Sequence, residues 1–428
     1  EGFLYSGLAP AYILETLTEP DPAVTERLSP GIPAAVAPCG DMLLVALRSE
    51  QVAAGARTFE QLEAASRHSV LAMIRVPEEG LGPASPPVIL SQVDLPLPLR
   101  ARHVCWTDIA SRRWAVVAAD GVRCPSIDPP LPDDSALVLV DITDPACPIL
   151  RADDTPQGRM RGRVALEGTP TALAVDGDLA LVGTQRHGVS LISLRDPEKP
   201  AVLSQRITFP FDGHSCCPAI ASITLRGETA WLGTDWGLFV LDLRTPDLSV
   251  VDRAAPLRGE LAVRYGTVFP ADGVRPFSVW DADPLSACRR VSELDSNVFP
   301  AKPAETADVR GHLAVASLDG DLALVDASDR ERPRLLDAIV FADGLSRGEC
   351  RDLIRDVLLF KGMAVAAVSG TRRPACPPAV RFFPVPVPYV RGSMPSPGTR
   401  VADGDFVPGF QFSEPLHSPE GEIPLGLY

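Results

Sequence analysis

The sequence predicts an all-β fold: a single seven-bladed β-propeller made of four-stranded antiparallel blades. Pairs of short apolar runs flank Gly-containing turns, which is the pattern of a β-hairpin. A third apolar strand follows each hairpin and ends in Asp or another polar residue and then, in most copies, Pro. A fourth, more polar strand completes the unit. Four-stranded units of about 40–50 residues are typical of propeller blades.

The first two strands of a blade are clearest in two segments. Residues 31–45 and 168–182 share a Gly-x-Pro, an apolar strand, a Gly-Asp turn and a second apolar strand. In the poorest copy, residues 257–263, Gly259 is the turn and the first strand is nearly missing. Weaker copies of the same hairpin lie at residues 104–117, 223–232, 307–315 and 357–365.

The third strand of each unit carries the most regular signal. A near-continuous apolar strand is expected where both faces are buried, and a following Asp-Pro or Thr-Pro favours a tight turn. Seven units begin near residues 34, 103, 171, 220, 257, 305 and 353; rings of six or eight blades are the alternatives. The polar residues that close the third strand are Asp141, Ser193, Asp242, Asp281 and Asp326, spaced by 52, 49, 39 and 45 residues.

One of these third strands resembles a known repeat. Leu137–Asp141, followed by the turn Ile142–Pro145, is similar to the LVIVD repeat, a family of β-propellers in bacterial surface and secreted proteins. The resemblance covers most of residues 31–391. It implies a propeller and a place in the cell envelope or outside the cell. The motif is structural, so the resemblance implies no catalytic residues.

Closure of the ring is predicted from a strand that has no partner in its own unit. Residues 11–17 resemble the fourth-strand segments 87–93 and 201–207, yet they lie upstream of the first blade. The last unit has only three strands and ends near residues 379–387. We expect residues 11–17 to complete the last blade, because pairing both ends of the chain in one sheet removes exposed edges.

The chain is expected to divide into a propeller over residues 1–391 and a Pro/Gly-rich tail over residues 392–428. A Pro-rich stretch at 384–398 favours extended structure. The tail is either a strap packed on the surface or an arm that reaches a partner subunit. The apolar residues available to dock it are Phe406, Phe410, Phe412, Leu416 and Tyr428.

Composition excludes two classes of protein. Acidic residues outnumber basic ones by 55 to 40 in 428 residues, and the net charge of −15 argues against a nucleic-acid partner, which needs clustered Lys and Arg. No run of 18 apolar residues occurs, so no membrane span is expected. Association with a cell surface stays open.

Cysteine usage bears on the compartment. The nine cysteines form no CxxC and no paired zinc pattern. They are either incidental buried thiols or, the interpretation we favour, loop-tying disulfides of an oxidising compartment. The chain begins at Glu1 rather than Met, which fits a processed export product or a trimmed chain. We therefore expect an exported protein that is periplasmic, on the outer surface or extracellular.

Two motifs raise the question of a metal. His214, Cys216 and Cys217 offer an imidazole and two thiols, but neighbouring residues rarely point at one ion. A disulfide with one thiol left free, or a strained disulfide between the two adjacent cysteines, is favoured. The Asp-Gly-Asp segments at 176–178 and 319–321 suggest a structural Ca²⁺, yet the further oxygen ligands of a calcium loop do not follow. Hairpin turns are favoured for both segments, and no cofactor is expected beyond that possible calcium ion.

The mouth of the central channel is the expected place for a ligand. Polar residues at the starts of the innermost strands would line it, and paired carboxylates there could do acid–base work, hold a cation or only be solvated. Trp236, in the turn 234–237, is a further candidate contact residue. The carboxylates nominated for the mouth are Asp108, Glu305, Asp308 and Asp356.

These observations predict a non-enzymatic binding or scaffold protein of the cell envelope or extracellular space. It would act as a propeller subunit or adhesin in an assembly with other protein subunits. The alternative is a metal-assisted hydrolase, lyase or oxidoreductase with its site at the channel mouth. A polar pocket on the channel axis with convergent Asp, Glu or His favours the enzyme, and a filled channel with an apolar rim favours the scaffold.

Overall fold

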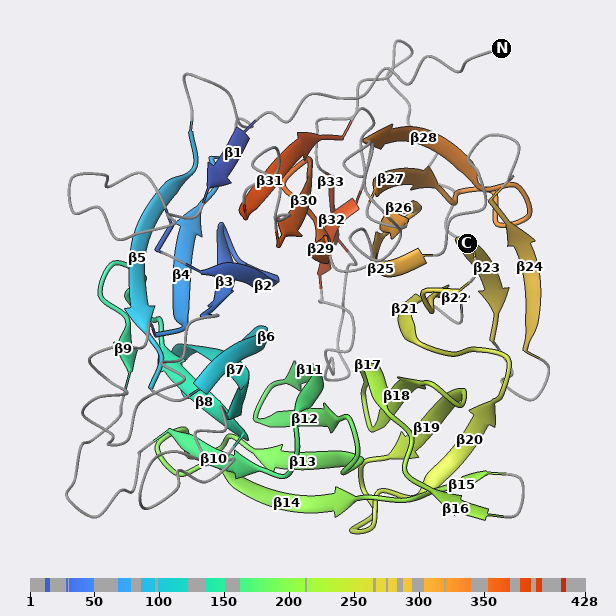
Figure 1. Ribbon diagram of the computed structural model, residues 1–428, viewed down its shortest axis with the longest axis horizontal. Helices are drawn as coiled ribbons and strands as arrows, with labels where there is room; N and C mark the ends of the chain where they lie inside the picture. Colours follow the sequence, from blue (N-terminus) through green and yellow to red (C-terminus); the bar gives the residue numbers. More distant parts are fainter. Residues whose placement is uncertain are drawn as a thin grey trace, which may run out of the picture.

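The computed structural model is a ring of seven antiparallel sheets around a central channel (Figure 1). Within the described residues no helix is long and apolar enough to cross a membrane. The structure describes residues 12–15, 28–29, 31–49, 68–77, 86–96, 99–121, 135–150, 162–211, 214–264, 267–274, 276–282, 288–294, 304–318, 321–339, 353–369, 378–385, 390–394 and 409–412.

Each sheet is a blade whose strands follow the chain from the channel outward, and this confirms the seven-bladed propeller. Blade 1 is β2 (Ile32–Cys39), β3 (Met42–Arg48), β4 (Val70–Arg75) and β5 (Val88–Asp94). Blade 2 is β6 (Leu99–Ile109), β7 (Arg112–Gly121), β8 (Ser135–Asp141) and β10 (Arg163–Leu166), and the short strand β9 (Ile149–Leu150) also pairs with β8. Blade 3 is β11 (Pro170–Asp176), β12 (Leu179–Thr184), β13 (Val189–Ser193) and β14 (Ala201–Arg206). Blades 4 and 5 are β17 (Ile220–Arg226), β18 (Thr229–Thr234), β19 (Leu238–Asp242) and β20 (Val250–Ala254); and β21 (Glu260–Arg264), β22 (Thr267–Ala271), β23 (Ser278–Asp281) and β24 (Arg289–Glu293). Blade 6 is β25 (Ala304–Arg310), β26 (Leu313–Leu318), β27 (Asp321–Asp326) and β28 (Arg334–Ile339), and blade 7 is β29 (Ile354–Phe360), β30 (Met363–Val368), β31 (Ala379–Pro384) and β1 (Tyr12–Glu15).

The N-terminal strand closes the ring as predicted. Strand β1 pairs antiparallel with β31, with Tyr12 opposite Phe382 and Glu15 opposite Ala379. Phe382 is fully buried in a core cluster that also holds Val45 of blade 1 and Val365 of blade 7. The first and last blades are therefore joined both by strand pairing and by a shared apolar core.

Burial explains the apolar third strands of the sequence. All seven residues of β8 are buried, and so are all six of β26 and all six of β30. These second and third strands lie between two neighbouring blades, so both of their faces need apolar side chains. The outer strand β5 has no fully buried residue, which accounts for its mixed composition.

The repeated Asp at the end of the third strand is a turn residue. Oδ1 of Asp141 accepts hydrogen bonds from the Thr143 amide at 3.0 Å and the Thr143 hydroxyl at 2.6 Å. Oδ1 of Asp326 accepts one from the Ser328 amide at 2.8 Å. These are Asx turns, in which the carboxylate takes up a backbone amide two residues ahead. The Asp of the repeat is therefore accounted for by structure alone.

Serines on the outer strands tie three pairs of blades together. The Ser91 hydroxyl of blade 1 donates to the Pro145 carbonyl of blade 2 at 2.5 Å. The Ser204 hydroxyl of blade 3 likewise donates to the Pro246 carbonyl of blade 4. In blade 5, the Ser292 hydroxyl donates to a carbonyl of blade 6, that of Arg330, at 2.6 Å. Each serine binds the turn that follows the third strand of the next blade.

The prediction for blade 5 is wrong, because it assigned the strand after Gly259 to the wrong position in the blade. Residues 260–264 form the first strand of this blade and pair with β22, rather than forming its second strand. Gly259 is not the hairpin turn; it precedes the strand with a φ of +77°. The apolar residues after Gly259 resemble those that follow the turn in other copies, and this similarity misled the prediction.

Two further strand pairs lie outside the blades. Strands β15 (Phe209–Phe211) and β16 (His214–Cys216) pair in the connection between blades 3 and 4. Strands β32 (Val390–Met394) and β33 (Gly409–Phe412) pair with each other, so the predicted boundary at residue 391 falls within β32. Of the residues expected to dock the tail, Phe406, Leu416 and Tyr428 lie outside the described residues.

Candidate functional site

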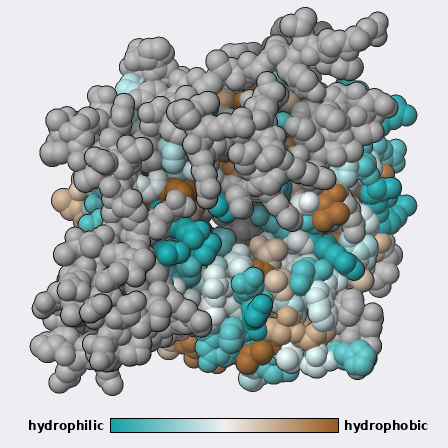
Figure 2. All heavy atoms as spheres, in the orientation of Figure 1, coloured by the Kyte–Doolittle hydropathy of each residue, from teal (hydrophilic) through white to brown (hydrophobic). Residues whose placement is uncertain are grey.

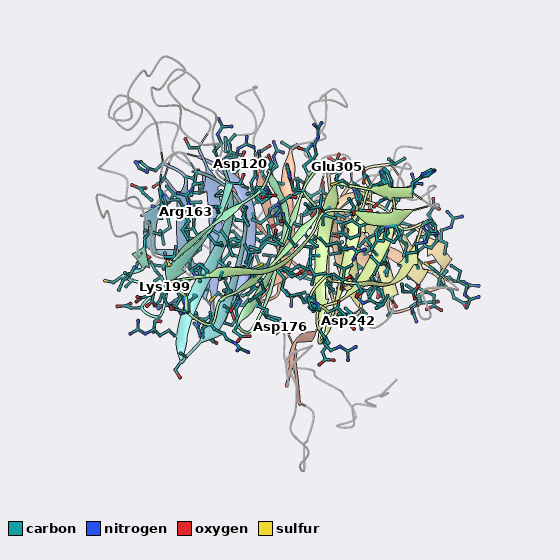
Figure 3. The ribbon with its side chains drawn as sticks, turned by 90° about the horizontal axis from the view of Figure 1, so that it is seen from below. Asp120, Arg163, Asp176, Lys199, Asp242 and Glu305 are labelled. Carbon is teal, nitrogen blue, oxygen red and sulfur yellow. The ribbon has the colours of Figure 1, made fainter. Side chains whose placement is uncertain are left out.

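The two faces of the disc differ in which strand ends they carry. Figure 3 shows Asp120 and Glu305 on one side of the disc and Asp176 and Asp242 on the other. We call the first side the start face, because innermost strands such as β25 begin there, with Glu305 as its second residue. The second side is the turn face, where the innermost hairpins turn, as β11 does after Asp176.

A β-bulge recurs near the start of six innermost strands. At each one the pairing with the second strand skips one residue, and β21 lacks such a shift. A bulge bends the strand locally and redirects the side chains next to it. The skipped residues are Ala34, Arg102, Thr171, Ala221, Glu305 and Arg355.

The residue after each bulge belongs to one ring around the channel. Glu260 lies four residues before the end of β21, as the residue after the bulge does in every bulged strand except β6, where the count is six. Six of the seven residues of this ring line a single cavity, and the seventh, Thr306, is hydrogen-bonded to Glu260. The ring consists of Ala35, His103, Ala172, Ser222, Glu260, Thr306 and Asp356.

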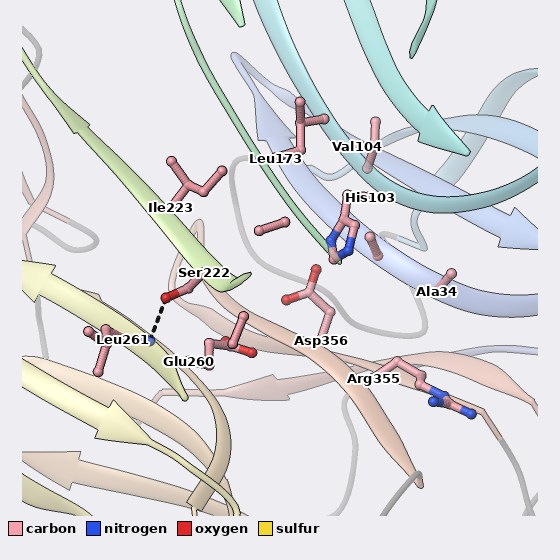
Figure 4. Close-up of a pocket in the computed structure, with 13 residues that line it drawn as sticks. Ala34, His103, Val104, Leu173, Ser222, Ile223, Glu260, Leu261, Arg355 and Asp356 are labelled. Atoms are coloured by element: carbon pink, nitrogen blue, oxygen red, sulfur yellow. Dashed lines mark hydrogen bonds between the residues drawn. The ribbon is translucent and has the colours of Figure 1, made fainter. Parts of the chain in front are cut away.

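The cavity lies on the propeller axis near the start face and has a volume of about 240 Å³. Innermost strands of six blades contribute to its wall. Figure 4 shows the side chains of His103, Glu260 and Asp356 turned toward the same space, with the Asp356 carboxyl group pointing toward the imidazole. In the space-filling view, hydrophilic side chains gather beside a hollow near the centre of the disc (Figure 2).

The polar ring residues also join neighbouring blades. Oδ2 of Asp356 accepts a hydrogen bond from the Val36 amide of blade 1 at 2.9 Å. Oε1 of Glu260 accepts one from the Thr306 hydroxyl of blade 6 at 2.7 Å. The Ser222 hydroxyl oxygen accepts one from the Leu261 amide of blade 5 at 2.8 Å. The inner edge of a blade has no strand beyond it, so these side chains satisfy amides that would otherwise lack partners.

Burial sets the protonation of the ring. It raises the pKa of Asp356 to about 8, although the hydrogen bond from the Val36 amide acts in the opposite direction. It also raises the pKa of Glu260 to about 7, against the hydrogen bond from Thr306. Burial and the nearby Arg102 lower the pKa of His103 to about 4. Near neutral pH the cavity therefore presents a protonated Asp356, a partly protonated Glu260 and an uncharged imidazole.

Of the four carboxylates nominated for the channel mouth, only Asp356 lines the cavity. Asp308 lies further along β25, where its Oδ2 accepts a hydrogen bond from the Leu359 amide of blade 7 at 2.9 Å. Glu305 is the bulge residue of β25 and is not part of the cavity wall.

Asp108 is not at the start of its strand, so its assignment to that end of the channel is wrong. It lies 57% exposed on the turn-face end of β6, 3.6 Å from Arg113 Nε. The reason is the length of β6, which begins at Leu99, five residues before the expected start.

The remaining candidates do not reach the cavity. Trp236 is half-buried in the turn between β18 and β19, where its amide donates to the Thr234 hydroxyl at 3.1 Å. The Cys217 thiol donates to the Arg186 carbonyl at 2.6 Å, and the Cys216 thiol contacts the Phe209 carbonyl at 3.5 Å. His214 is exposed on β16.

No group of three His, Cys, Asp or Glu in the described part of the chain could hold a metal ion. The Asp-Gly-Asp segment at 176–178 is a hairpin turn, and Asp178 Oδ2 lies 2.7 Å from Arg195 Nε. Asp319 falls outside the described residues. Among the described residues, neither the turn at 176–178 nor His214, Cys216 and Cys217 bring three such groups together.

No disulfide joins any two of the six described cysteines. Cys39 and Cys105 are surrounded by protein, and burial raises the pKa of each thiol to about 12. The expected loop-tying disulfides are therefore not found at positions 39, 105, 147, 216, 217 and 288. Cys124, Cys350 and Cys376 lie outside the described residues.

Sequence reasoning did not nominate three polar ring residues that line the cavity: His103, Ser222 and Glu260. Glu260 was missed because the hairpin of blade 5 was misread. A usable signal exists in the spacing, since Ser222 and Asp356 each lie four residues before the last residue of their innermost strand, as Glu260 does. Aligning the blades on their hairpin turns would have placed Ser222, Glu260 and Asp356 in one ring, but not His103, which lies six residues before the end of β6.

Comparisons with known proteins add little to this picture. No family model matches the chain, and no curated protein matches it. Among solved structures, the chain is similar to the crystal structure of the computationally designed Ika8 protein, with 11% identity and a TM-score of 0.47, over 83% of this chain and 96% of that one. The seven-bladed fold rests on the strand pairing of the chain itself.

Proposed function

We propose that this propeller is a non-enzymatic binding protein whose ligand site is the cavity on the channel axis. The observation that supports the proposal is the convergence of His103, Glu260 and Asp356 on one space from three different blades. A protonated carboxyl group donates a hydrogen bond as well as accepting one, and a neutral imidazole does both. Such a wall suits a small polar molecule that carries oxygen or nitrogen atoms.

The size of the cavity restricts the ligand. Pockets for drug-sized molecules measure about 300–1,000 Å³, and this one is smaller, at about 240 Å³. Alanines occupy ring positions 35 and 172, so part of the wall is apolar. The expected ligand is a compact molecule held by a few polar contacts against a short aliphatic surface.

The place and partners of the protein belong to the same proposal. The resemblance of residues 137–145 to the LVIVD repeat supports an exported bacterial protein of the envelope or extracellular space. Exposed apolar side chains on the outer strands of adjoining blades, Leu203 at 56% and Val251 at 56%, support contact with another subunit. Native mass measurement on the protein from its source tests this part, and a single species of 45.6 kDa would contradict it.

An acid–base enzyme is the second candidate. The convergence of His103, Glu260 and Asp356 on the channel axis is the arrangement expected of an enzyme, so it favours this candidate as well as a binding site. Glu260 has a pKa of about 7, which is suited to taking up and releasing a proton near neutral pH. Glu260→Gln distinguishes the two functions, since glutamine keeps an acceptor for Thr306 but cannot exchange a proton. A bound molecule that the wild type converts and this variant only binds would establish the enzyme.

Saturation-transfer NMR with glycerol, acetamide and acetate as probes tests the ligand site. Ala221→Leu places a larger side chain in the cavity wall without removing a polar group. Ala174→Leu, on β11 but outside the cavity wall, is the matched control. We expect at least one probe to bind the wild type and the control, and to lose its signal with Ala221→Leu. Equal signals from all three proteins would overturn the proposal.

A further inference from the structure

Four arginines gather at the start-face end of the channel, beside the cavity. We call Arg48, Arg100, Arg102 and Arg355 the arginine cluster. Arg48 ends β3 of blade 1, Arg100 and Arg102 lie at the start of β6 of blade 2, and Arg355 is the bulge residue of β29 of blade 7. The other three guanidinium groups are close enough to act electrostatically on Arg48.

Asp120 balances part of this charge. Arg102 forms a two-pronged ion pair with Asp120, with Nε–Oδ1 and Nη2–Oδ2 distances of 2.9 Å each. The Nε atoms of Arg48 and Arg100 are buried and have no hydrogen-bond partner among the described residues. Burial lowers the pKa of Arg48, and Arg102, Arg100 and Arg355 lower it further, with Asp120 as the opposing charge.

Buried guanidinium N–H groups without partners are costly, because they lose their hydration and gain nothing in return. The cost is unexpected in a chain whose net charge is −15, since acidic residues were available to neutralise the cluster. An anionic ligand would supply the missing acceptors, and guanidinium groups match carboxylate and phosphate oxygens in pairs.

The cluster and the cavity are continuous through β29. Arg355 lines the cavity, and so does the next residue, Asp356. Figure 4 shows the Arg355 side chain extending away from the Asp356 carboxyl group. A molecule with one anionic end could therefore reach both features, with its uncharged part beside the protonated carboxyl group of Asp356.

We propose that the arginine cluster binds the carboxylate or phosphate group of the small molecule held in the channel cavity. This inference rests on the proposed function and narrows its ligand to a small carboxylic acid or phosphate ester. Arg48 and Arg100 supply the free N–H donors, Arg102 is fixed by Asp120, and the ring residues contact the polar remainder.

Titration calorimetry with glycerol, glycerate and glycerol 3-phosphate tests the proposal with one carbon skeleton in three charge states. We expect both anions, or one of them, to bind the wild type at least tenfold more tightly than glycerol. The anion that binds identifies the source of the charge as carboxylate or phosphate. Binding of glycerol as tight as that of the anions would overturn the inference, and so would no anion binding up to about 10 mM.

Arginine variants locate the effect. Arg48→Gln with Arg100→Gln should reduce anion affinity at least tenfold, and Arg48→Lys with Arg100→Lys should recover part of it. Arg195→Gln removes an exposed arginine paired with Asp178 on the turn face and should change nothing. Unchanged anion affinity in the double glutamine variant would refute the cluster as the site.

The outcomes separate this inference from the proposed function. Glycerol binding that Ala221→Leu abolishes, together with anions that bind no better, would leave the cavity site standing and remove the anion site. Anion binding that needs Arg48 and Arg100 but ignores Ala221→Leu would keep the anion site and remove the cavity site.

Discussion

Replacing Asp356 with Asn should change how the stability of the protein depends on pH. The pKa of Asp356 is about 8 in the folded protein, against an ordinary value of 3.8, because burial disfavours the charged form. Folding therefore takes up a proton between these values. The contribution of the protonated Asp356 to the free energy of unfolding is complete below pH 3.8 and is lost as the pH rises through about 8.

The magnitude follows from proton linkage. One proton taken up on folding changes the free energy of unfolding by up to about 1.4 kcal/mol for each pH unit, and by less as solvent enters the channel. In Asp356→Asn this slope is absent, while the amide oxygen still accepts one of the hydrogen bonds made to the carboxyl group. The free energy of unfolding of the variant should therefore rise relative to that of the wild type as the pH increases from 5 to 8.

Urea unfolding at pH 5, 6, 7 and 8 measures the effect. The wild-type free energy of unfolding should fall with pH more steeply than that of Asp356→Asn, and the difference between the two slopes is the quantity to compare. Asp337→Asn is the control, because Asp337 lies on the outer strand β28 and bonds only the adjacent amide, that of Ala338. Parallel curves for wild type and Asp356→Asn would refute the assignment of a protonated carboxyl group.

Two further predictions concern contacts between blades. Ser91→Ala removes the hydrogen bond from Ser91 to the Pro145 carbonyl and should cost about 1 kcal/mol in urea unfolding, whereas Ser328→Ala, at an exposed turn, should cost nothing measurable. Gly233→Ala would push a methyl group against the Gly259 carbonyl and to 2.5 Å from the Ser222 hydroxyl, and should lower stability by about 1–3 kcal/mol. Gly227→Asn is the control for that variant, since open space surrounds Gly227 and asparagine tolerates its φ of +59°. Wild-type unfolding midpoints for Ser91→Ala or Gly233→Ala would contradict the contacts described.

The blade count and the closing strand were predictable because both depend on local composition. Strands buried on two faces, such as β8, need continuous apolar sequence, and the resemblance of residues 11–17 to other fourth strands showed where the ring closes. The ring of polar residues was harder to find. A bulge is a property of how two strands pair, so nothing in a single strand marks His103 as the residue that turns inward.

Asp108 and Asp356 show why candidate carboxylates could not be sorted from the sequence. Both follow the same expectation for an innermost strand, but β6 starts five residues earlier than expected and carries Asp108 to the opposite end of the channel. Glu260 was missed for a different reason, because its strand was predicted as the second strand of blade 5 and is in fact the first. The arginine cluster combines side chains from blades 7, 1 and 2, and their sequence separation hides the association.

The pairing of β1 with β31 also constrains the order in which the molecule can be built. Tyr12 and Phe382 are roughly 370 residues apart in the chain, and closing so long a loop costs about 5 kcal/mol of chain entropy. That cost is met only when the last blade is present, so the N-terminal strand must wait without its partner while the preceding blades form. During synthesis the nascent protein is an open arc with two unsatisfied edges, and its completion coincides with the arrival of the C-terminal blade.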